Sequence, residues 1–130
     1  LEQFAAGRPE NPPPFDIVTM WDVIEHLTDP AATLKLVNSV LKEDGLLCLS
    51  TVNLANYRHL IYKNKWRGFA EGQEHTLFFS PPALGLLLRK CGFKPTKIVT
   101  RSIPPLLLKW LNIFKLGHEL EAYAIKAQQA

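Results

Sequence analysis

Apolar residues along this chain form short continuous runs, separated by segments in which they recur at helical spacing. The first run extends from Phe15 to Met20 and the second from Leu46 to Val52. Continuous apolar runs of this length, without a period of about 3.6 residues, are typical of strands buried inside a sheet. We therefore expect two interior strands at these positions.

The segment between the two runs is predicted to be a helix over residues 30 to 43. Asp29 supplies an N-cap, Pro30 suits the first helical position, and Gly45 can take the left-handed conformation that ends a helix. The apolar positions recur at helical spacing, at Leu34, Val37, Val40 and Leu41. A strand, a helix and a strand with short links form a βαβ unit with parallel strands. The predicted fold class is therefore α/β.

The remaining segments complete a single domain over residues 1 to 130. A short helical turn is expected over Asp22 to Leu27, and a longer helix over residues 80 to 91. Residues 94 to 101 and 119 to 126 read as two final strands that form an antiparallel pair. Three other segments show no clean period: a leading loop over residues 1 to 14, a long functional loop over 53 to 79, and an apolar insert over 103 to 117.

Composition excludes several classes of protein. The 130 residues are 47% hydrophobic and 21% charged, which fits one globular domain and excludes disorder. The net charge of +3 is scattered, so no nucleic-acid-binding surface is expected. Pro104 and Pro105 interrupt the most apolar stretch, which is too short to cross a membrane.

The two cysteines, Cys48 and Cys91, lack the spacing of metal ligands or of a disulfide scaffold. No targeting leader is evident. We therefore expect buried thiols in a reducing, cytoplasmic compartment.

Polar residues that could perform chemistry follow the two predicted strands. Trp21 and Asp22 come after the first strand, and Asn53 comes after the second. In an open α/β sheet, ligands bind beyond the carboxyl ends of the strands. Where the turn after the first strand is helical, Asp22, Glu25 and His26 lie along one face, because they are spaced i, i+3 and i+4. These residues form the candidate site.

A resemblance to a known family rests on several segments taken together. They are Phe15-Asp16-Ile17-Val18, Asp22-Val23-Ile24-Glu25-His26-Leu27, Leu41-Lys42-Glu43-Asp44-Gly45, Ser50-Thr51-Val52-Asn53 and, later, Gly68, His75, Phe79-Ser80-Pro81 and Gly92-Phe93. In their joint order and spacing they resemble the second half of a class I S-adenosylmethionine-dependent methyltransferase. The resemblance covers residues 15 to about 100.

The resemblance implies a Rossmann-like sheet and S-adenosylmethionine as cofactor. This chain would hold strands four to seven, with an antiparallel final strand, and would lack the first three strands. The glycine-rich loop that this family places against the cofactor is absent, since Gly7 is isolated and no glycine pair precedes Phe15. The first strand of this chain would then be an edge. An apolar edge invites a homo-oligomer, formed through this strand or through the apolar insert.

The resemblance also implies a set of cofactor-binding residues. Trp21 stands where this family places a residue against the cofactor, and its ring could stack on adenine or face the sulfonium. Met20, Asp22 and Asn53 complete the predicted set. The alternative for Trp21 is an aromatic ring that covers the end of the sheet. The alternative for Asn53 is a residue that starts the following loop.

His26 and His75 are the candidate catalytic residues. His26 could act as general base towards a substrate hydroxyl, because imidazole exchanges protons near neutral pH. His75 lies in the long loop that this family uses over the substrate, and the alternative is an ordinary solvent-exposed loop histidine. Asp22, Glu25 and His26 further resemble the set that ubiquinone-pathway O-methyltransferases use near a divalent cation. We favour the alternative, that the carboxylates stabilise a helix N-terminus, and assign no metal.

The function that the resemblance implies is methyl transfer from S-adenosylmethionine to an unidentified small-molecule, glycan or lipid-precursor acceptor, as part of a longer enzyme. The alternative is a non-catalytic binding or assembly module that keeps the methyltransferase core without the cofactor loop. A small-molecule substrate is the expected partner in the first case. No nucleic acid and no transmembrane segment is expected in either case.

Overall fold

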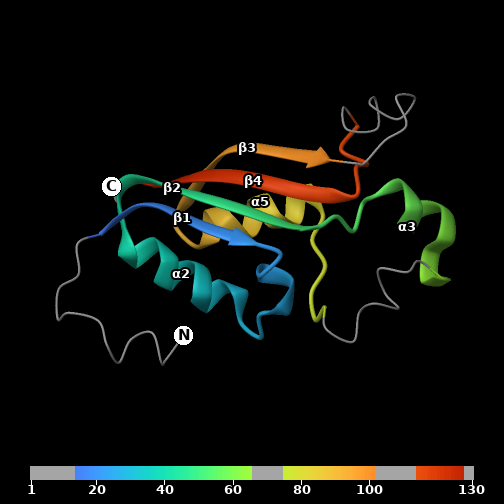
Figure 1. The fold of residues 1–130 in the computed structure, drawn as a ribbon, viewed down its shortest axis with the longest axis horizontal. Coiled ribbons are helices and arrows are strands. Elements are labelled where there is room, and N and C mark those ends of the chain that lie inside the picture. The colour runs from blue at the N-terminus through green and yellow to red at the C-terminus, as the bar shows by residue number, and fades with distance from the viewer. Residues whose placement is uncertain (1–13, 66–74, 102–113, 128–130) are drawn as a thin grey trace.

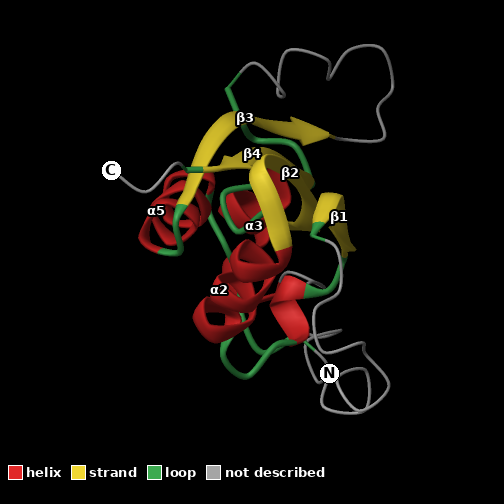
Figure 2. Ribbon diagram, turned by 90° about the vertical axis from the view of Figure 1, so that its left-hand side faces the viewer, coloured by secondary structure: helices red, strands yellow, loops and turns green. Residues whose placement is uncertain are grey.

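The computed structural model describes residues 14–65, 75–101 and 114–127. Within these residues the chain forms a four-stranded sheet with helices on one of its faces (Figures 1 and 2). The predicted leading loop, the centre of the long loop and most of the apolar insert lie outside the described residues.

The sheet is mixed. Its strands are β1 (Phe15–Trp21), β2 (Leu41–Val52), β3 (Phe93–Arg101) and β4 (Glu119–Lys126), in the spatial order β1-β2-β4-β3. β1 and β2 are parallel, whereas β4 is antiparallel to both of its neighbours, β2 and β3. This confirms the predicted α/β class and the antiparallel final pair. It also places β1 at an edge of the described sheet, as predicted.

Two helices pack against the sheet and begin where the sequence predicts. α2 (Pro30–Val40) connects β1 to β2, and α5 (Pro81–Lys90) precedes β3. The Asp29 carboxylate accepts the N–H of Ala32 at 2.9 Å, and the Ser80 hydroxyl oxygen accepts the N–H of Ala83 at 3.4 Å. These side chains satisfy backbone donors that the first turn of a helix leaves without partners. The shorter elements are the 3₁₀ turns η1 (Ile24–His26) and η2 (Lys63–Lys65) and the helix α3 (Tyr57–Tyr62).

The junction between α2 and β2 differs from the prediction. The helix ends at Val40, earlier than predicted, and β2 begins at Leu41. Leu41 is fully buried and pairs with Phe15, while the next aligned pair is Ile17 with Leu46. The apolar side chain of Leu41 is therefore buried as part of the sheet, and this tertiary contact outweighs the local preference for another helical turn.

The residues between Leu41 and Leu46 form an irregularity at the start of β2. The left-handed residue there is Asp44, with a φ of 62°, and not Gly45 as predicted. Gly45 is needed for another reason, because a Cβ at this position would lie 2.8 Å from the backbone oxygen of Lys42. The ammonium of Lys42 lies 2.5 Å from the carboxylate of Asp16, which joins the irregular segment to β1.

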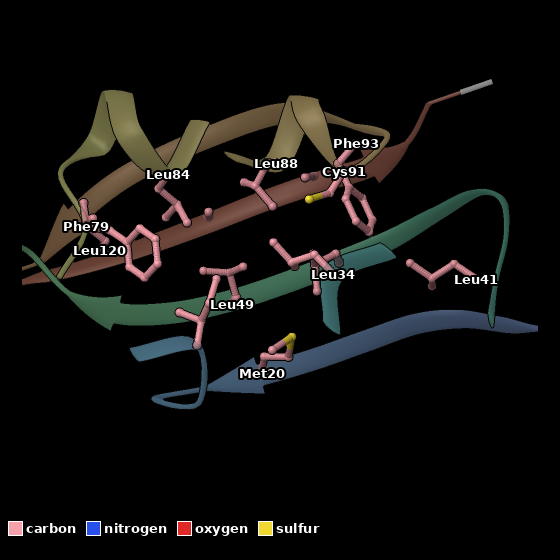
Figure 3. Packing of buried hydrophobic residues seen from close by; sticks show 14 residues of the cluster. Met20, Leu34, Leu41, Leu49, Phe79, Leu84, Leu88, Cys91, Phe93 and Leu120 are labelled. Atoms are coloured by element: carbon pink, nitrogen blue, oxygen red, sulfur yellow. The ribbon is translucent and has the colours of Figure 1, made fainter. Parts of the chain in front are cut away.

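The hydrophobic core lies between the sheet and the helices. Leu34 of α2 and Leu84 and Leu88 of α5 are fully buried, and they face the strands in Figure 3. The strand residues of this cluster alternate along each strand, as side chains on one face must. They are Met20 on β1, Leu41, Leu47 and Leu49 on β2, Phe93 on β3, and Leu120, Ala122 and Ala124 on β4.

The opposite face of the sheet carries Ile17, Thr19 and Trp21, all of which are exposed. Thr19 is aligned with Cys48 of β2, which in turn is aligned with Tyr123 of β4, so these residues share that face. None of the helices in the described residues lies against it (Figure 2). We call it the open face. None of the helices in the described ranges has the length and apolar character of a membrane span.

Candidate functional site

The turn that follows β1 is fixed by the neighbouring strand. Asp22 has a left-handed backbone, with a φ of 50°. Its N–H donates to the hydroxyl oxygen of Ser50 at 3.1 Å, and this hydroxyl donates to the Asp22 carboxylate at 2.9 Å. Ser50 is aligned with Trp21 in the sheet. The two hydrogen bonds therefore hold the chain at the carboxyl end of the parallel pair, where ligands bind in open α/β sheets.

The 3₁₀ turn η1 is joined to the end of the long loop by three hydrogen bonds to one carbonyl. The backbone oxygen of Glu25 accepts the N–H of Thr76 at 2.9 Å and the N–H of Leu77 at 3.1 Å. It also accepts the hydroxyl of Thr76 at 3.0 Å. These bonds bring His75 beside His26, and their ring centroids are 4.8 Å apart. Two residues far apart in the sequence thus become neighbours.

Glu25, His26 and His75 form a compact group, which we call the Glu-His-His cluster. Each residue offers one ligand atom, and these atoms lie within 4.8 Å of one another. Glu25 is fully buried, and neither of its carboxylate oxygens has a hydrogen-bond partner in the described part of the chain. Nδ1 of His75 is buried without a partner there as well. Buried polar atoms without partners are costly, so such a group calls for a proton, a cation or a substrate atom.

The cluster differs in one member from the set that the sequence placed on one helical face. Asp22 lies before η1 and bonds to Ser50, while His75 stands with Glu25 and His26. The predicted face assumed a continuous helical turn from Asp22 onwards. The left-handed backbone at Asp22 interrupts that turn, so the side chain of Asp22 is directed by β2 instead.

Carboxylates gather at the same end of the sheet. Burial, followed by the nearby charges of Asp22 and Glu121, raises the pKa of the Glu119 carboxyl, while a hydrogen bond from Ser50 and the charge of Arg101 act in the opposite direction. Glu121 pairs with Arg101, whose Nε lies 2.5 Å from the carboxylate. The hydrogen bond to Glu121 is the largest reason why the pKa of the Tyr123 hydroxyl is raised. This end of the sheet is therefore acidic.

The predicted cofactor-binding residues have different surroundings. Trp21 is 51% exposed at the end of β1, whereas Met20 is part of the core. The amide nitrogen of Asn53 donates to the carbonyls of Lys115 at 3.0 Å and Gly117 at 2.7 Å, and its oxygen accepts the N–H of Ala55 at 2.9 Å. The side chain of Asn53 thus ties the end of β2 to the residues before β4. Its contact with a cofactor stays a prediction.

Two positioning residues, Ser50 and Thr76, were not recognised in the sequence, and Asn53 was named there as a cofactor-binding residue or as the start of the following loop. Ser50 fixes the turn at Asp22, Thr76 fixes His75 against η1, and Asn53 fixes the segment before β4. Ser50 and Asn53 belong to the quoted segment Ser50-Thr51-Val52-Asn53, which was the one available signal for them. A hydroxyl or amide side chain in a loop has many ordinary roles, so its partners cannot be read from its position in the chain.

The two cysteines are buried and neither forms a disulfide. Burial raises the pKa of the thiol of Cys48 and, as the largest cause, that of Cys91. Both side chains are therefore neutral thiols near neutral pH, which makes them poor nucleophiles and metal ligands. This agrees with the prediction that both are buried thiols.

Comparison with known proteins identifies the family. Residues 2–98 match a family model described as a methyltransferase domain. The ubiquinone biosynthesis O-methyltransferase of Aromatoleum aromaticum is 27% identical, over 99% of this chain and 55% of that protein. The protein of the same name from Xanthomonas euvesicatoria is 32% identical, over 97% of this chain and 54% of that protein. The chain therefore spans about half the length of these curated relatives.

Solved structures show the same fold. An S-adenosylmethionine-dependent methyltransferase from Thermotoga maritima has a TM-score of 0.70 at 23% identity, over 94% of this chain and 61% of that chain. One from Archaeoglobus fulgidus has a TM-score of 0.62 at 21% identity, over 88% of this chain and 60% of that chain. The chain belongs to the class I S-adenosylmethionine-dependent methyltransferase domain family and is homologous to the ubiquinone biosynthesis O-methyltransferases.

Proposed function

We propose that this chain is part of an enzyme that transfers a methyl group from S-adenosylmethionine to an oxygen atom of a small-molecule, glycan or lipid-precursor acceptor. The observation that carries the proposal is the buried carboxylate of Glu25, without partners among the described residues, beside the imidazoles of His26 and His75 at the carboxyl end of the sheet. The choice of oxygen as acceptor is supported by the names of the curated relatives.

In this reaction the protein mainly aligns the acceptor with the cofactor and removes one proton from the acceptor hydroxyl. The bound cofactor supplies a methyl group activated by its sulfonium sulfur. The acceptor oxygen forms a bond to the methyl carbon while the carbon–sulfur bond breaks and its electron pair goes to sulfur. The hydroxyl proton passes to the imidazole of His26 or His75, and the nearby carboxylate of Glu25 stabilises the imidazolium that results.

The residues at this end of the sheet fit the cofactor in part. The exposed ring of Trp21 offers an aromatic face for adenine or for the sulfonium, and Met20 and Asp22 are its neighbours in the sequence. No glycine-rich turn precedes β1 in this sequence, so the main-chain contacts of such a turn are missing. We therefore expect the 130-residue chain alone to bind S-adenosylmethionine weakly or not at all.

Calorimetric titration of this chain with S-adenosylmethionine tests the completeness of the pocket. Binding at micromolar concentrations would contradict an incomplete pocket. A longer protein that carries a glycine-rich turn upstream and binds the cofactor supports the enzyme. A longer protein with an unrelated start and no cofactor affinity supports the alternative of a non-catalytic binding or assembly module.

The activity test uses the longer protein with methyl-labelled S-adenosylmethionine and a set of hydroxylated acceptors. Replacing His75 with alanine should lower turnover by about 10²-fold or more, the scale of a lost general base, while cofactor affinity stays unchanged. His118→Ala is the matched control, because His118 is exposed and lies outside the cluster. Label found on nitrogen or carbon, or full activity in both the His26→Ala and the His75→Ala variant, would overturn this assignment.

Binding of a divalent cation is a second candidate function of the same cluster. It is favoured by the buried carboxylate of Glu25, which has no hydrogen-bond partner among the described residues. One carboxylate oxygen and two imidazole nitrogens suit Mn²⁺, Fe²⁺ or Zn²⁺ better than Mg²⁺. Equilibrium dialysis with Mn²⁺ and Zn²⁺ decides the question. Glu25→Gln and His75→Ala should each weaken binding by about tenfold or more, with His118→Ala unchanged. Absence of binding in the unmodified protein leaves the cluster with its acid–base role alone.

Two further expectations remain proposals. A cytoplasmic location is supported by the two unpaired, buried thiols. A homo-oligomer is supported by the position of β1 at an edge of the described sheet, since an edge strand offers unpaired backbone groups to another chain.

A further inference from the structure

A pocket of about 400 Å³ lies away from the Glu-His-His cluster, between α5, β3 and the residues that precede β4. Its walls come from Pro81, Arg89 and neighbouring residues of α5, from Ile98 of β3, and from Phe114 to Leu116. None of the cluster residues lines it. Its volume is at the lower end of the range of small-molecule sites.

The described part of the lining combines apolar surface with positive charge. Among the residues that the structure describes, Arg89 and Lys115 are the ionised side chains of the lining, and none of its members is an aspartate or glutamate. Both side chains are exposed, and neither forms an ion pair with another residue in the described ranges. The rest of the wall is apolar and includes Pro82, Ile98 and Leu116. A ligand that matches this wall has an apolar body and an anionic group.

Gly85 gives the pocket part of its shape. It lies within α5, where glycine is less favourable than alanine. A Cβ at this position would lie 3.2 Å from Cδ1 of Ile98 and 3.4 Å from Nη1 of Arg89, two residues of the same wall. The bare backbone of Gly85 therefore leaves room for the guanidinium of Arg89 and for the side of the pocket formed by β3.

We propose that this pocket is a second binding site, which takes a small apolar anion: a carboxylate or a phosphate ester attached to a hydrocarbon or aromatic body. The anionic group lies between the guanidinium of Arg89 and the ammonium of Lys115, and the body lies along Pro82, Ile98 and Leu116. The proposal does not depend on methyl transfer, because none of these residues belongs to the cluster that carries that function.

Calorimetric titration of the 130-residue chain with decanoate and with decyl phosphate tests the proposal. Decanol serves as an uncharged probe of the same length, and inorganic phosphate serves as an anion without an apolar body. We expect both amphiphilic anions to bind at least tenfold more tightly than decanol and inorganic phosphate. The stronger of the two anions identifies the head group as carboxylate or phosphate.

Variants then place the binding in this pocket. The double variant Arg89→Gln, Lys115→Gln should weaken decanoate and decyl phosphate at least tenfold and leave decanol unchanged. Lys90→Gln is the matched control, because Lys90 is exposed on the same helix and does not line the pocket. Gly85→Ala, which narrows the wall without removing charge, should weaken both anions several-fold.

The proposal is wrong when neither anion binds at millimolar concentration, or when decanol binds as tightly as decanoate. It is equally wrong when the double variant keeps the affinity of the unmodified chain while its unfolding transition is unchanged.

Discussion

The two faces of the sheet differ most along the edge strand β1, because Cys48, Ser50 and Glu121 of the open face are buried towards the centre of the sheet. On the face that α2 and α5 cover, Leu49 and Leu120 are fully buried, whereas on the open face Ile17 is 56% exposed and Trp21 is 51% exposed. Side chains alternate between the faces along each strand, so Met20 of β1, between the exposed Thr19 and Trp21, is buried on the covered face. Apolar surface on the covered face is removed from water and stabilises the fold, while similar surface on the open face contributes little.

Because of this difference in burial, residues of the covered face contribute mainly to stability, whereas exposed residues of the open face are available for binding. Residues of the covered face hold the helices against the sheet, and Ile24 of η1 and Phe79 at the end of the long loop belong to the same core cluster. Trp21, on the open face, remains accessible at the end of β1 where the cofactor is expected. A substitution on the first face should therefore change stability, and one on the second face should change binding or association.

The largest expected effect is on stability. Leu49→Ala should lower the free energy of unfolding by about 2 to 5 kcal/mol, because it leaves a cavity between the sheet and the helices. Ile17→Ala should cost less than about 1 kcal/mol, because much of this side chain is already in water. Urea denaturation followed by circular dichroism measures both. Equal losses of unfolding free energy in the two variants would show that the open face is covered in solution, and the two faces would then not differ in burial.

The next effect is on cofactor binding. Trp21→Ala should weaken S-adenosylmethionine binding by the longer protein by about 1 to 3 kcal/mol, the scale of a lost aromatic platform, with little change in stability. Leu36→Ala is a suitable control, since Leu36 is a comparably exposed apolar residue on α2. Calorimetry measures the affinities. An unchanged affinity in a folded Trp21→Ala variant would remove Trp21 from the site.

A smaller effect is expected on self-association. If the edge at β1 joins two copies of the chain, Ile17→Lys should weaken the association at least about tenfold, or about 1.4 kcal/mol, because a charge on an edge strand disfavours pairing. Light scattering over a concentration series gives the mass. A constant mass near 14.7 kDa in the unmodified chain would contradict self-association.

The smallest effect concerns pH and the acidic end of the sheet. The pKa of Glu119 is raised above its ordinary value of 4.5, chiefly by burial, so the neutral carboxyl favours the folded state. This stabilisation is fully present below the unfolded pKa and is lost as the pH rises through the folded pKa. Glu119→Gln should therefore stabilise the chain at pH 7, by less than about 1 kcal/mol because the side chain is partly exposed.

Thermal unfolding at two pH values checks this prediction. The gain from Glu119→Gln should disappear at about pH 3.5, where the carboxyl is neutral in both states. Glu43→Gln is a control, since Glu43 is an exposed residue at the other end of β2 that pairs with Lys126. A gain that persists at low pH would show that charge is not its cause.

The sequence by itself determined most of the secondary structure and the fold class. The bounds of β1, β4 and α5 follow from local patterns, because period, caps and the left-handed Gly92 are properties of neighbouring residues. The edge position of β1 also followed, through the resemblance to the methyltransferase family.

Only the tertiary structure decided the end of α2 and the composition of the site. The buried pairing of Leu41 with β1 ended the helix early, and hydrogen bonds from Thr76 to the carbonyl of Glu25 brought His75 to His26. Asp22 was expected with these residues but is held by Ser50 on the neighbouring strand. Such contacts join residues that are remote in the chain. They depend on how the strands and loops pack, and a local pattern carries no information about that packing.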